Sequence, residues 1–433
     1  MTRVDAGRLN ALQVASHGGY LLVSNNPAHA KRGAKTLGQH CGRNNKMKLL
    51  MISPVPTDLP TAGNRVRVLN LLTALERLGH DVTFAYVPYE HGDVDYMAME
   101  TRLGHRLRVL QSNRPPFPSS VGRFKRKIRR ALKLPSAHLW DVDEWFDDAL
   151  LSQVKKLQIA ENFETVLIEY VFLSKVVSVL PKTVRTVIDT HDLMGNRHKH
   201  YLKFGLNPTW FMTTPGEEIH ALSRATATIA IQSEEAGYLR RHVCGDVFCV
   251  GHVSAQEIIP LEDPGGSGML FVGSANPINI HGLEWFVESM LPRVRAAIPS
   301  CELSIAGPAG QVRSWPKGVK VCGPVESLVS EYAKAALVIN PVIFGTGLAI
   351  KTIEALSYGK ALVVTAAGAR GLGVEFSAAM SIAEDSNTFA QQIIELLRNK
   401  AARIKLSQNA VAAIRAWRLQ QLVALDASVK GSK

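Results

Sequence analysis

Short apolar runs alternate with helix-like segments along most of this chain, and the alternating series occurs twice. The first series opens with a strand-like run at 47–53, a helical pattern at 66–79 and a second strand-like run at 81–87. The same order restarts near Met269. A strand–helix–strand unit sets its two strands parallel through a right-handed crossover. The sequence therefore predicts an α/β fold with two Rossmann-like, doubly wound domains facing a cleft, where the carboxyl ends of the strands bind ligands.

Composition divides the chain into five parts. Residues 1–46 hold seven Lys or Arg against a single acid and show no sustained periodicity, which predicts a basic, disordered N-terminal extension. Residues 261–268, LEDPGGSG, have the composition of a linker. We expect the two Rossmann-like domains at 47–260 and 269–410, and a C-terminal helix or tail at 411–433.

The bulk numbers exclude several classes of protein. With 46% hydrophobic and 20% charged residues, the 433-residue chain is typical of a globular protein. The longest apolar run, 335–350, is broken by Asn, Pro and Gly and falls short of the roughly 20 residues of a transmembrane helix. Five cysteines without a CxxC pair argue against a disulfide framework or a zinc site. The net charge of +13 predicts an anionic partner: nucleic acid, a membrane surface or phosphorylated small molecules.

A strongly basic segment, VGRFKRKIRRALKLP at 121–135, holds seven basic residues. Phe124, Ile128 and Leu132 fall on one helical face, a pattern typical of contact with an anionic membrane surface. The alternative is a solvated helix whose apolar residues dock on the domain. Aromatic residues are sparse there and no nucleic-acid motif occurs, so we expect no nucleic-acid partner. The candidate membrane-contact residues are Arg123, Phe124, Lys125, Arg126, Lys127, Ile128, Arg129 and Arg130.

The segment GTGLAIKTIEALSYGK at 345–360 follows an apolar strand-like run. Gly345 and Gly347 let backbone amides approach an anion, which the dipole of the helix expected at 348–358 would attract. Lys351 adds a full positive charge in the first turn, and Glu354 can accept hydrogen bonds from a ribose diol. The segment predicts a nucleoside diphosphate site. The alternative is an ordinary helix with a surface Lys–Glu pair and a glycine turn.

This segment, with its continuation ALVVTAAGARGL, resembles the donor-site signature of family 4 glycosyltransferases of the GT-B fold. Residues 47–82, 187–202 and 269–308 resemble further parts of that family in the same order. The resemblance implies that a sugar, a hexose or acetamidohexose, is transferred with retention from a UDP- or GDP-sugar to a lipid-linked or polysaccharide acceptor. It also implies a nucleotide-sugar co-substrate, no permanently bound cofactor and no metal. The expected location is the cytoplasm, with peripheral attachment to the inner face of the plasma membrane as a further expectation.

The resemblance also assigns residues. It makes 47–260 the acceptor side and 269–410 the donor side, with Lys351 at the diphosphate and Glu354 at the ribose. His191 follows a strand ending near Asp189, which places it at the cleft lip, where it can contact the sugar or the acceptor. The alternative makes His191 and Asp192 caps of the next segment. The catalytic candidates are Lys351 and His191; the donor-binding candidates are Gly63, Ser274, His281, Gly345, Thr346, Gly347, Lys351 and Glu354; the acceptor-side candidates are Arg65 and Asp192.

Three positions depart from the family pattern. Thr346 stands where many members have a second acid, which leaves the sugar unspecified. Ser274 and His281 stand where many have Arg and Lys, which leaves the diphosphate incompletely neutralised. Arg65 and Arg67 are candidates to compensate, and Arg67 can equally be a solvated helix residue.

Two other functions fit the same pattern. A nucleotide-sugar epimerase of this architecture needs acid/base carboxylates in the cleft, which the sequence does not place. A non-catalytic sugar-nucleotide-binding protein would explain the departures at Thr346, Ser274 and His281.

Overall fold

The computed structural model describes residues 46–431 apart from short gaps at 59–62, 90–93, 113–123, 125–126, 130, 133, 204, 206–207, 209, 254–257, 326 and 346. Residues 47–433 form one compact unit, separate from residues 1–46. The predicted N-terminal extension therefore lies outside the described residues, except for Lys46.

The N-terminal half is built on a seven-stranded parallel sheet with the order β3-β2-β1-β4-β5-β6-β7. All of its strands except the two at the edges are almost fully buried, because helices cover both faces of a doubly wound sheet and apolar side chains must point both ways. The strands are β1 (Lys48–Ser53), β2 (Asp81–Tyr86), β3 (Leu107–Val109), β4 (Thr165–Glu169), β5 (Arg185–Asp189), β6 (Ala227–Ala230) and β7 (Asp246–Cys249). The helices are α2 (Gly63–Arg77), α3 (Tyr96–Leu103), α5 (Ala149–Glu161), α6 (Arg197–Lys203), α7 (Pro215–Leu222) and α8 (Ser233–Arg240).

The C-terminal half repeats the design with a six-stranded parallel sheet of order β10-β9-β8-β11-β12-β13. The helical stretch after the first strand of this half is two helices that meet at Met290, with Pro292 in the first turn of the second one, where a missing amide hydrogen is tolerated. The strands are β8 (Gly268–Val272), β9 (Glu302–Ala306), β10 (Val319–Gly323), β11 (Leu337–Asn340), β12 (Leu362–Thr365) and β13 (Ser381–Ala383). The helices are α9 (Pro277–Ser289), α10 (Leu291–Ala297), α11 (Leu328–Lys334), α12 (Ile350–Ser357), α13 (Ser386–Arg398) and α14 (Lys400–Lys430).

Both sheet orders reverse direction next to the first strand of their half, between β1 and β4 and between β8 and β11. Such a switch point opens a crevice at the carboxyl ends of the strands, where doubly wound folds bind ligands. The predicted fold class, two Rossmann-like domains, is confirmed.

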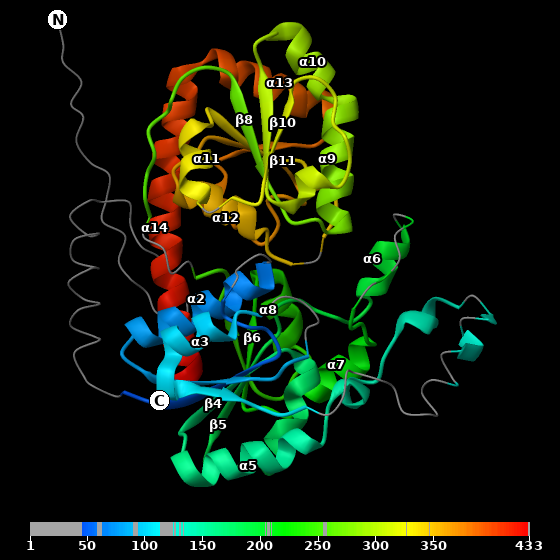
Figure 1. The fold of residues 1–433 in the computed structure, drawn as a ribbon, viewed down its shortest axis with the longest axis vertical. Coiled ribbons are helices and arrows are strands. Elements are labelled where there is room, and N and C mark those ends of the chain that lie inside the picture. The colour runs from blue at the N-terminus through cyan, green and yellow to red at the C-terminus, as the bar shows by residue number, and fades with distance from the viewer. Residues whose placement is uncertain are drawn as a thin grey trace, which may run out of the picture. The chain divides into compact units, whose positions relative to one another are not determined.

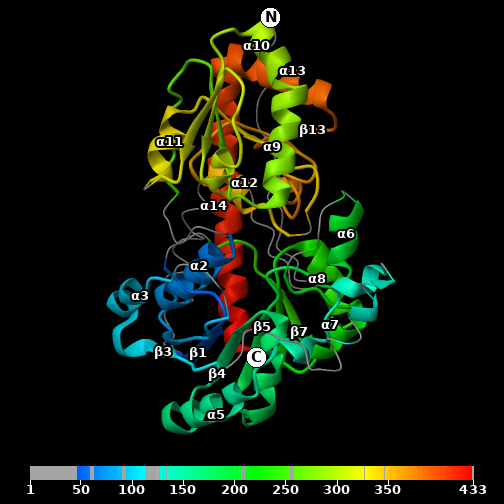
Figure 2. The ribbon, with the colours of Figure 1, turned by 45° about the vertical axis from the view of Figure 1, so that its right-hand side comes forward.

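One long helix joins the two cores. The 31-residue α14 runs without a break through the position where the sequence suggested a boundary, 410/411. Ile414 and Trp417 belong to a core of the C-terminal half, while Leu425 and Val429 belong to the core of the N-terminal half. Figures 1 and 2 show this helix passing beside both sheets.

Candidate functional site

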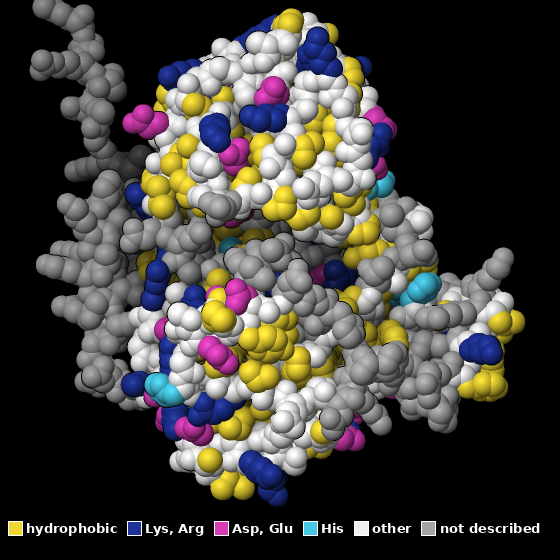
Figure 3. Space-filling view, in the orientation of Figure 1, with side chains coloured by type: hydrophobic (Ala, Val, Ile, Leu, Met, Phe, Trp, Pro, Cys, Tyr) yellow, Lys and Arg dark blue, Asp and Glu magenta, His cyan; other side chains and the backbone are white. Residues whose placement is uncertain are grey.

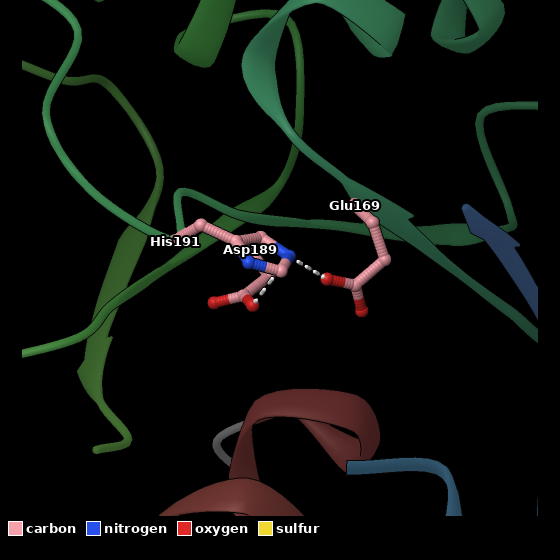
Figure 4. A group of neighbouring side chains, drawn as sticks. All are labelled: Glu169, Asp189 and His191. Carbon is pink, nitrogen blue, oxygen red and sulfur yellow. Dashed lines mark hydrogen bonds and ion pairs between the residues drawn. The ribbon is translucent and has the colours of Figure 1, made fainter. Parts of the chain in front are cut away.

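Three polar side chains gather where neighbouring strands of the N-terminal sheet end. Glu169 is the last residue of β4, Asp189 is the last residue of β5, and His191 follows two residues later. Figure 4 shows the three side chains converging from these strand ends. His191 Nε2 lies 2.5 Å from Glu169 Oε2 and 3.5 Å from Asp189 Oδ2. The structure therefore places His191 inside a buried network at the carboxyl edge of the sheet.

The backbone and a neighbouring ring fix the orientation of His191. Its φ of 58° lies in the left-handed region, which a non-glycine residue adopts only when its surroundings hold it there. The imidazole stacks on the Tyr170 ring, with centroids 3.8 Å apart. Because Nε2 forms a hydrogen bond with Glu169, Nδ1 is the ring nitrogen that could contact a sugar.

Arg67 completes the network, and both expectations for it were wrong. Its side chain is 2% exposed, so it is neither solvated nor free to neutralise a phosphate. Its Nε and terminal nitrogen donate to the two oxygens of Asp189 at 2.7 and 2.6 Å. It also donates to the carbonyls of Gly251 and Val250 at 2.7 and 3.0 Å. The positive charge of Arg67 is therefore matched inside the protein.

Burial sets the protonation of this network. Burial raises the pKa of Glu169 well above its usual range, and the negative charge of Asp189 adds to the rise. Burial also acts to raise the pKa of Asp189, but the Arg67 charge overrides it and holds that pKa low. The pKa of His191 is lowered by burial to about 3. At neutral pH the network therefore consists of an ionised Asp189–Arg67 pair beside a neutral Glu169 and a neutral His191.

The same three residues could hold a metal ion by spacing, because their ligand atoms lie within 4.8 Å of one another. Arg67 already occupies both oxygens of Asp189, and Glu169 is protonated at neutral pH. A cation would have to displace that guanidinium, so the donor set favours an internal hydrogen-bond network over a metal centre.

The donor-side candidates lie at the carboxyl edge of the second sheet. Lys351 sits in the first turn of α12, where its Nζ donates to Asn279 Oδ1 and lies 4.8 Å from the centroid of the Phe271 ring. Among the described residues, no carboxylate forms an ion pair with it, and burial lowers its pKa to about 7. Lys351 therefore carries a partly buried charge that no described carboxylate pairs with directly, and the nearby Glu354 charge only partly offsets the effect of burial on its pKa.

Glu354 lies one turn further along α12. Its Oε2 accepts a hydrogen bond of 3.2 Å from the hydroxyl of Tyr332, a fully buried residue. Burial raises the pKa of Glu354 to about 7, despite the opposing effects of Tyr332 and Lys351. A carboxyl group with this pKa can accept hydrogen bonds from a diol when it is ionised.

Asn279 is a site residue that sequence reasoning missed. It lies in the first turn of α9, three residues after the N-cap Asn276, and its Nδ2 donates to the Ser274 carbonyl at 3.0 Å and to Ser274 Oγ at 3.3 Å. With its Oδ1 on Lys351, it links two predicted donor residues. The Asn-Pro-x-Asn spacing of an N-cap and first turn is the signal that could have found it. His281 instead packs edge-on against Phe344, with ring centroids 5.6 Å apart.

Residues predicted from opposite halves meet at the first turn of α12. A side-chain carbon placed on Gly63, the first residue of α2, would lie 3.4 Å from Ile350. One placed on Gly347 would lie 3.6–3.7 Å from the carboxyl atoms of Asp192. The structure thus brings the start of α2, the Gly347 loop and Asp192 to one junction beside Lys351. Thr346 lies outside the described residues.

Two arginines lie near this junction, Arg65 on α2 and Arg370 in the loop after β12. Arg65, an acceptor-side candidate, is 7% exposed on α2. Arg370, which sequence reasoning did not select, donates from a terminal nitrogen to the Gly345 carbonyl at 2.5 Å. This hydrogen bond connects the loop after β12 with the glycine loop after β11, so a residue distant in sequence helps to fix the conformation of the glycine loop.

Further buried acids surround Asp192. Glu218 on α7 accepts hydrogen bonds from the backbone amides of Met194 and Gly195 at 2.7 and 2.8 Å, and burial raises its pKa to about 7. Glu235 on α8 accepts from Gln232 at 3.1 Å, and burial followed by the Asp192 charge raises its pKa to about 9. Sequence reasoning missed both acids, because their burial depends on how α7 and α8 pack and not on their own segments.

The basic segment is described only in part. Arg123, Lys125, Arg126 and Arg130 lie outside the described residues. Phe124, Ile128 and Leu132 are 65%, 44% and 64% exposed, so the alternative in which they dock on the domain does not hold for them. Among the described helices, none is long and apolar enough to cross a bilayer. On the face drawn in Figure 3, charged side chains of both signs are interspersed.

Comparisons of the sequence with known proteins give two matches that bear on its family. Residues 266–399 match the model of the family "Glycosyl transferases group 1". A stretch of 155 residues, 33% of this chain, is 29% identical to an uncharacterized 44.6 kDa protein in the cps region of Klebsiella pneumoniae, and the match spans 40% of that relative.

Solved structures resemble the chain over most of its length. Sucrose-phosphate synthase from Thermosynechococcus elongatus superposes with a TM-score of 0.59 at 16% identity, covering 87% of this chain and 97% of that one. TarM superposes with a TM-score of 0.62 at 11% identity, covering 89% of this chain and 99% of that one. Anabaena HepE in complex with UDP and glucose superposes with a TM-score of 0.55 at 13% identity, covering 88% of this chain and 97% of that one. Residues 266–399 therefore match the group 1 glycosyl transferase model, and the chain shares the two-domain fold of these solved structures.

Proposed function

We propose that this protein is a retaining glycosyltransferase. It moves a hexose or acetamidohexose from a UDP- or GDP-sugar to a lipid-linked or polysaccharide acceptor. The group 1 domain and the UDP bound in structures of HepE and of S. aureus TarM support a nucleotide-sugar donor. The cps-region relative supports a role in polysaccharide synthesis.

The observation that carries the proposal is the unmatched charge of Lys351. Its ammonium contacts an amide oxygen and an aromatic ring, and among the described residues no carboxylate forms an ion pair with it, although the Glu354 charge acts to raise its pKa. A partly buried cation in this state gains most from an anionic ligand. The starts of α2 and α12 approach each other beside it, since a side-chain carbon placed on Gly63 would lie 3.4 Å from Ile350. A diphosphate bound there would be stabilised by two helix dipoles and one ammonium.

This arrangement supplies what a leaving diphosphate needs without a metal ion. Charge develops on the bridging oxygen as the bond to the sugar breaks, and preorganised donors at that point lower the barrier. Lys351 would donate to the leaving group, while the carboxylate of Glu354 would hold the ribose hydroxyls. His191, neutral and fixed by Glu169 and Tyr170, would donate or accept one hydrogen bond at the sugar through Nδ1.

We place the acceptor at a membrane surface in the cytoplasm. The support is the exposed apolar face of Phe124, Ile128 and Leu132 in a basic segment. Such a face is expected to bind vesicles that contain anionic lipid and to ignore neutral ones. Cosedimentation of the full chain with phosphatidylglycerol and phosphatidylcholine vesicles tests this, with Phe124→Ser/Ile128→Ser as the matched variant. Equal binding of variant and wild type would remove the proposed surface.

A thermal-unfolding screen tests the donor assignment. UDP-, GDP-, ADP- and CMP-sugars are added singly to the full chain, and a UDP- or GDP-sugar is expected to raise the melting temperature by mass action. The best donor is then incubated with candidate lipid-linked acceptors, and the anomeric configuration of the product is read by NMR. Stabilisation by none of the four classes would contradict the proposal, as would an inverted product. Binding without turnover on any acceptor would favour a non-catalytic sugar-nucleotide-binding protein.

One observation keeps the epimerase in view as a second candidate. Asp192 and Glu235 lie together next to Gly347, and the high pKa of Glu235 makes it a proton donor at neutral pH. An epimerase needs such a carboxyl pair beside the sugar. Incubating the donor alone separates the two functions, because only the epimerase would return an isomerised sugar nucleotide.

A further inference from the structure

A cavity lies in the C-terminal half, at the opposite end of α12 from Lys351. It has a volume of about 320 Å³ and is lined by the linker, by the residues that enter β12 and by the start of α14. Its charged lining residues are Glu262, Asp263, Lys360, Lys400 and Arg403. None of these contributes to the junction at Gly63, Gly347 and Asp192, so the cavity is separate from the candidate donor site.

Two buried cations in this wall, Arg403 and Lys360, lie near the carboxylate of Asp263, but only Arg403 forms hydrogen bonds with it among the described contacts. Arg403, 3% exposed, donates to both oxygens of Asp263 at 2.6 and 3.0 Å. Asp263 Oδ1 also accepts from the Gly265 amide at 2.7 Å. Lys360 is only 2% exposed, and its Nζ makes a single long hydrogen bond, 3.4 Å, to the Glu262 carbonyl. The carboxylate nearest to Lys360 is thus already committed to Arg403.

The charge of Lys360 is therefore incompletely matched. Burial lowers the pKa of this lysine to about 8, although the Asp263 charge acts to raise it; the Arg403 charge makes a smaller contribution in the lowering direction. At neutral pH most of the molecules still carry the ammonium, and a buried cation without a counter-ion is costly. Lys400 adds a second, exposed cation at the first position of the 31-residue α14, whose N-terminus also favours an anion.

We propose that this cavity binds a small phosphate-bearing anion, either inorganic phosphate or a phosphomonoester. Lys360 would hold it from inside the cavity and Lys400 from the rim. The exposed Glu262 would oppose it, because its side chain is an acid in the same wall. The bound anion would tie the linker to β12 and α14, since Leu261 already donates its amide to the Tyr358 carbonyl at 3.0 Å.

The test uses the full chain carrying Lys351→Met, so that phosphate held at the candidate donor site is removed from the measurement. Equilibrium dialysis with radiolabelled phosphate, at constant ionic strength in potassium chloride and pH 7, is expected to show about one phosphate per chain. Lys360→Met should abolish this binding, Glu262→Gln should tighten it, and Lys320→Met, an exposed lysine on β10, should leave it unchanged. Repeating the titration with glycerol 3-phosphate separates the sources: tighter binding assigns a phosphomonoester, and equal or weaker binding assigns free phosphate.

Thermal unfolding provides an independent readout. Without phosphate, Lys360→Met should be at least as stable as the parent, because it removes an unmatched buried charge. With phosphate the parent should become the more stable of the two. A purely structural lysine predicts that Lys360→Met is less stable at every phosphate concentration. That result, or phosphate binding that survives Lys360→Met, would overturn the proposal.

Discussion

In the N-terminal half, Arg67 donates to both oxygens of Asp189 at 2.7 and 2.6 Å, so a fully buried cation meets a fully buried anion. In the C-terminal half, Lys351 donates only to the amide oxygen of Asn279 and lies over the Phe271 ring. The charge of Arg67 is paired with Asp189, whereas Lys351 has no ion pair among the described residues. The comparison teaches that strong burial of charge does not mark a ligand site by itself. We expect a ligand site instead where a buried charge lacks an ion pair.

The largest expected effect concerns the matched site. Asp189→Asn leaves Arg67 buried without a counter-ion and should lower the free energy of unfolding by about 3–5 kcal/mol. Glu169→Gln should not lower it at pH 7, because the amide has the shape of a neutral carboxyl and, unlike the wild-type carboxyl with its raised pKa, needs no proton uptake on folding. Chemical denaturation at pH 7 measures both.

The pH dependence of this matched pair sharpens the comparison. In the unfolded chain Glu169 ionises near its ordinary pKa, whereas its raised pKa keeps it protonated in the fold. The wild type therefore loses stability as pH rises above that ordinary value, and Glu169→Gln does not. The stability of the variant relative to wild type should increase from pH 5 to pH 8. A relative stability that falls over this range would contradict the neutral state of Glu169.

The next effect concerns the unmatched site. Lys351→Met should lower kcat/KM for sugar transfer by about 10²–10³-fold, because it removes one preorganised donor at the leaving group. The melting temperature should hold or rise, since an unmatched charge is lost. Lys320→Met serves as the control and should leave both quantities unchanged. Near-normal turnover by Lys351→Met would remove the diphosphate assignment.

Glu354→Gln should have a smaller effect. Loss of a charged acceptor at the ribose should weaken UDP binding by about 10–100-fold, in line with hydrogen bonds to charged groups. Binding of inorganic pyrophosphate should stay within about twofold, because it lacks a ribose. Calorimetric titration with both ligands separates the two contributions. Equal losses for UDP and pyrophosphate would mean that Glu354 acts through Lys351 and not on the sugar ring.

The smallest expected effect is on the pH dependence of UDP binding. The pKa of Lys351 is about 7 in the free protein, and a bound diphosphate must raise it. Binding then takes up a proton, so affinity should fall by up to about tenfold per pH unit above 7. Lys351→Arg should flatten the profile between pH 7 and 9, since a guanidinium stays protonated there. An equally steep profile in that variant would point to another titrating group.

Local patterns in the sequence predicted most of the fold. The apolar runs at 47–53 and 81–87 predicted β1 and β2 to within one residue at each end, because strands buried on both faces need continuous apolar sequence. The three-residue β13 was missed, since so short a segment carries little signal. Lys351 and Glu354 could be proposed from the sequence because their motif, glycine turn and helix lie in one segment.

The remainder of the site depends on tertiary packing. Arg67 and Asp189 are separated by 122 residues in the chain, and nothing around Arg67 distinguishes it from a solvated helix residue. The buried positions of Glu169, Glu218 and Glu235 follow from the elements packed around them. For the same reason sequence reasoning could not place Asp192 beside Gly347.

A crystal structure of the full chain with bound UDP tests the central claim most directly. The account predicts a diphosphate oxygen within about 3 Å of Lys351 Nζ, between the starts of α2 and α12, with the ammonium drawn away from Asn279. A diphosphate bound elsewhere, with Lys351 still donating to Asn279, would contradict it.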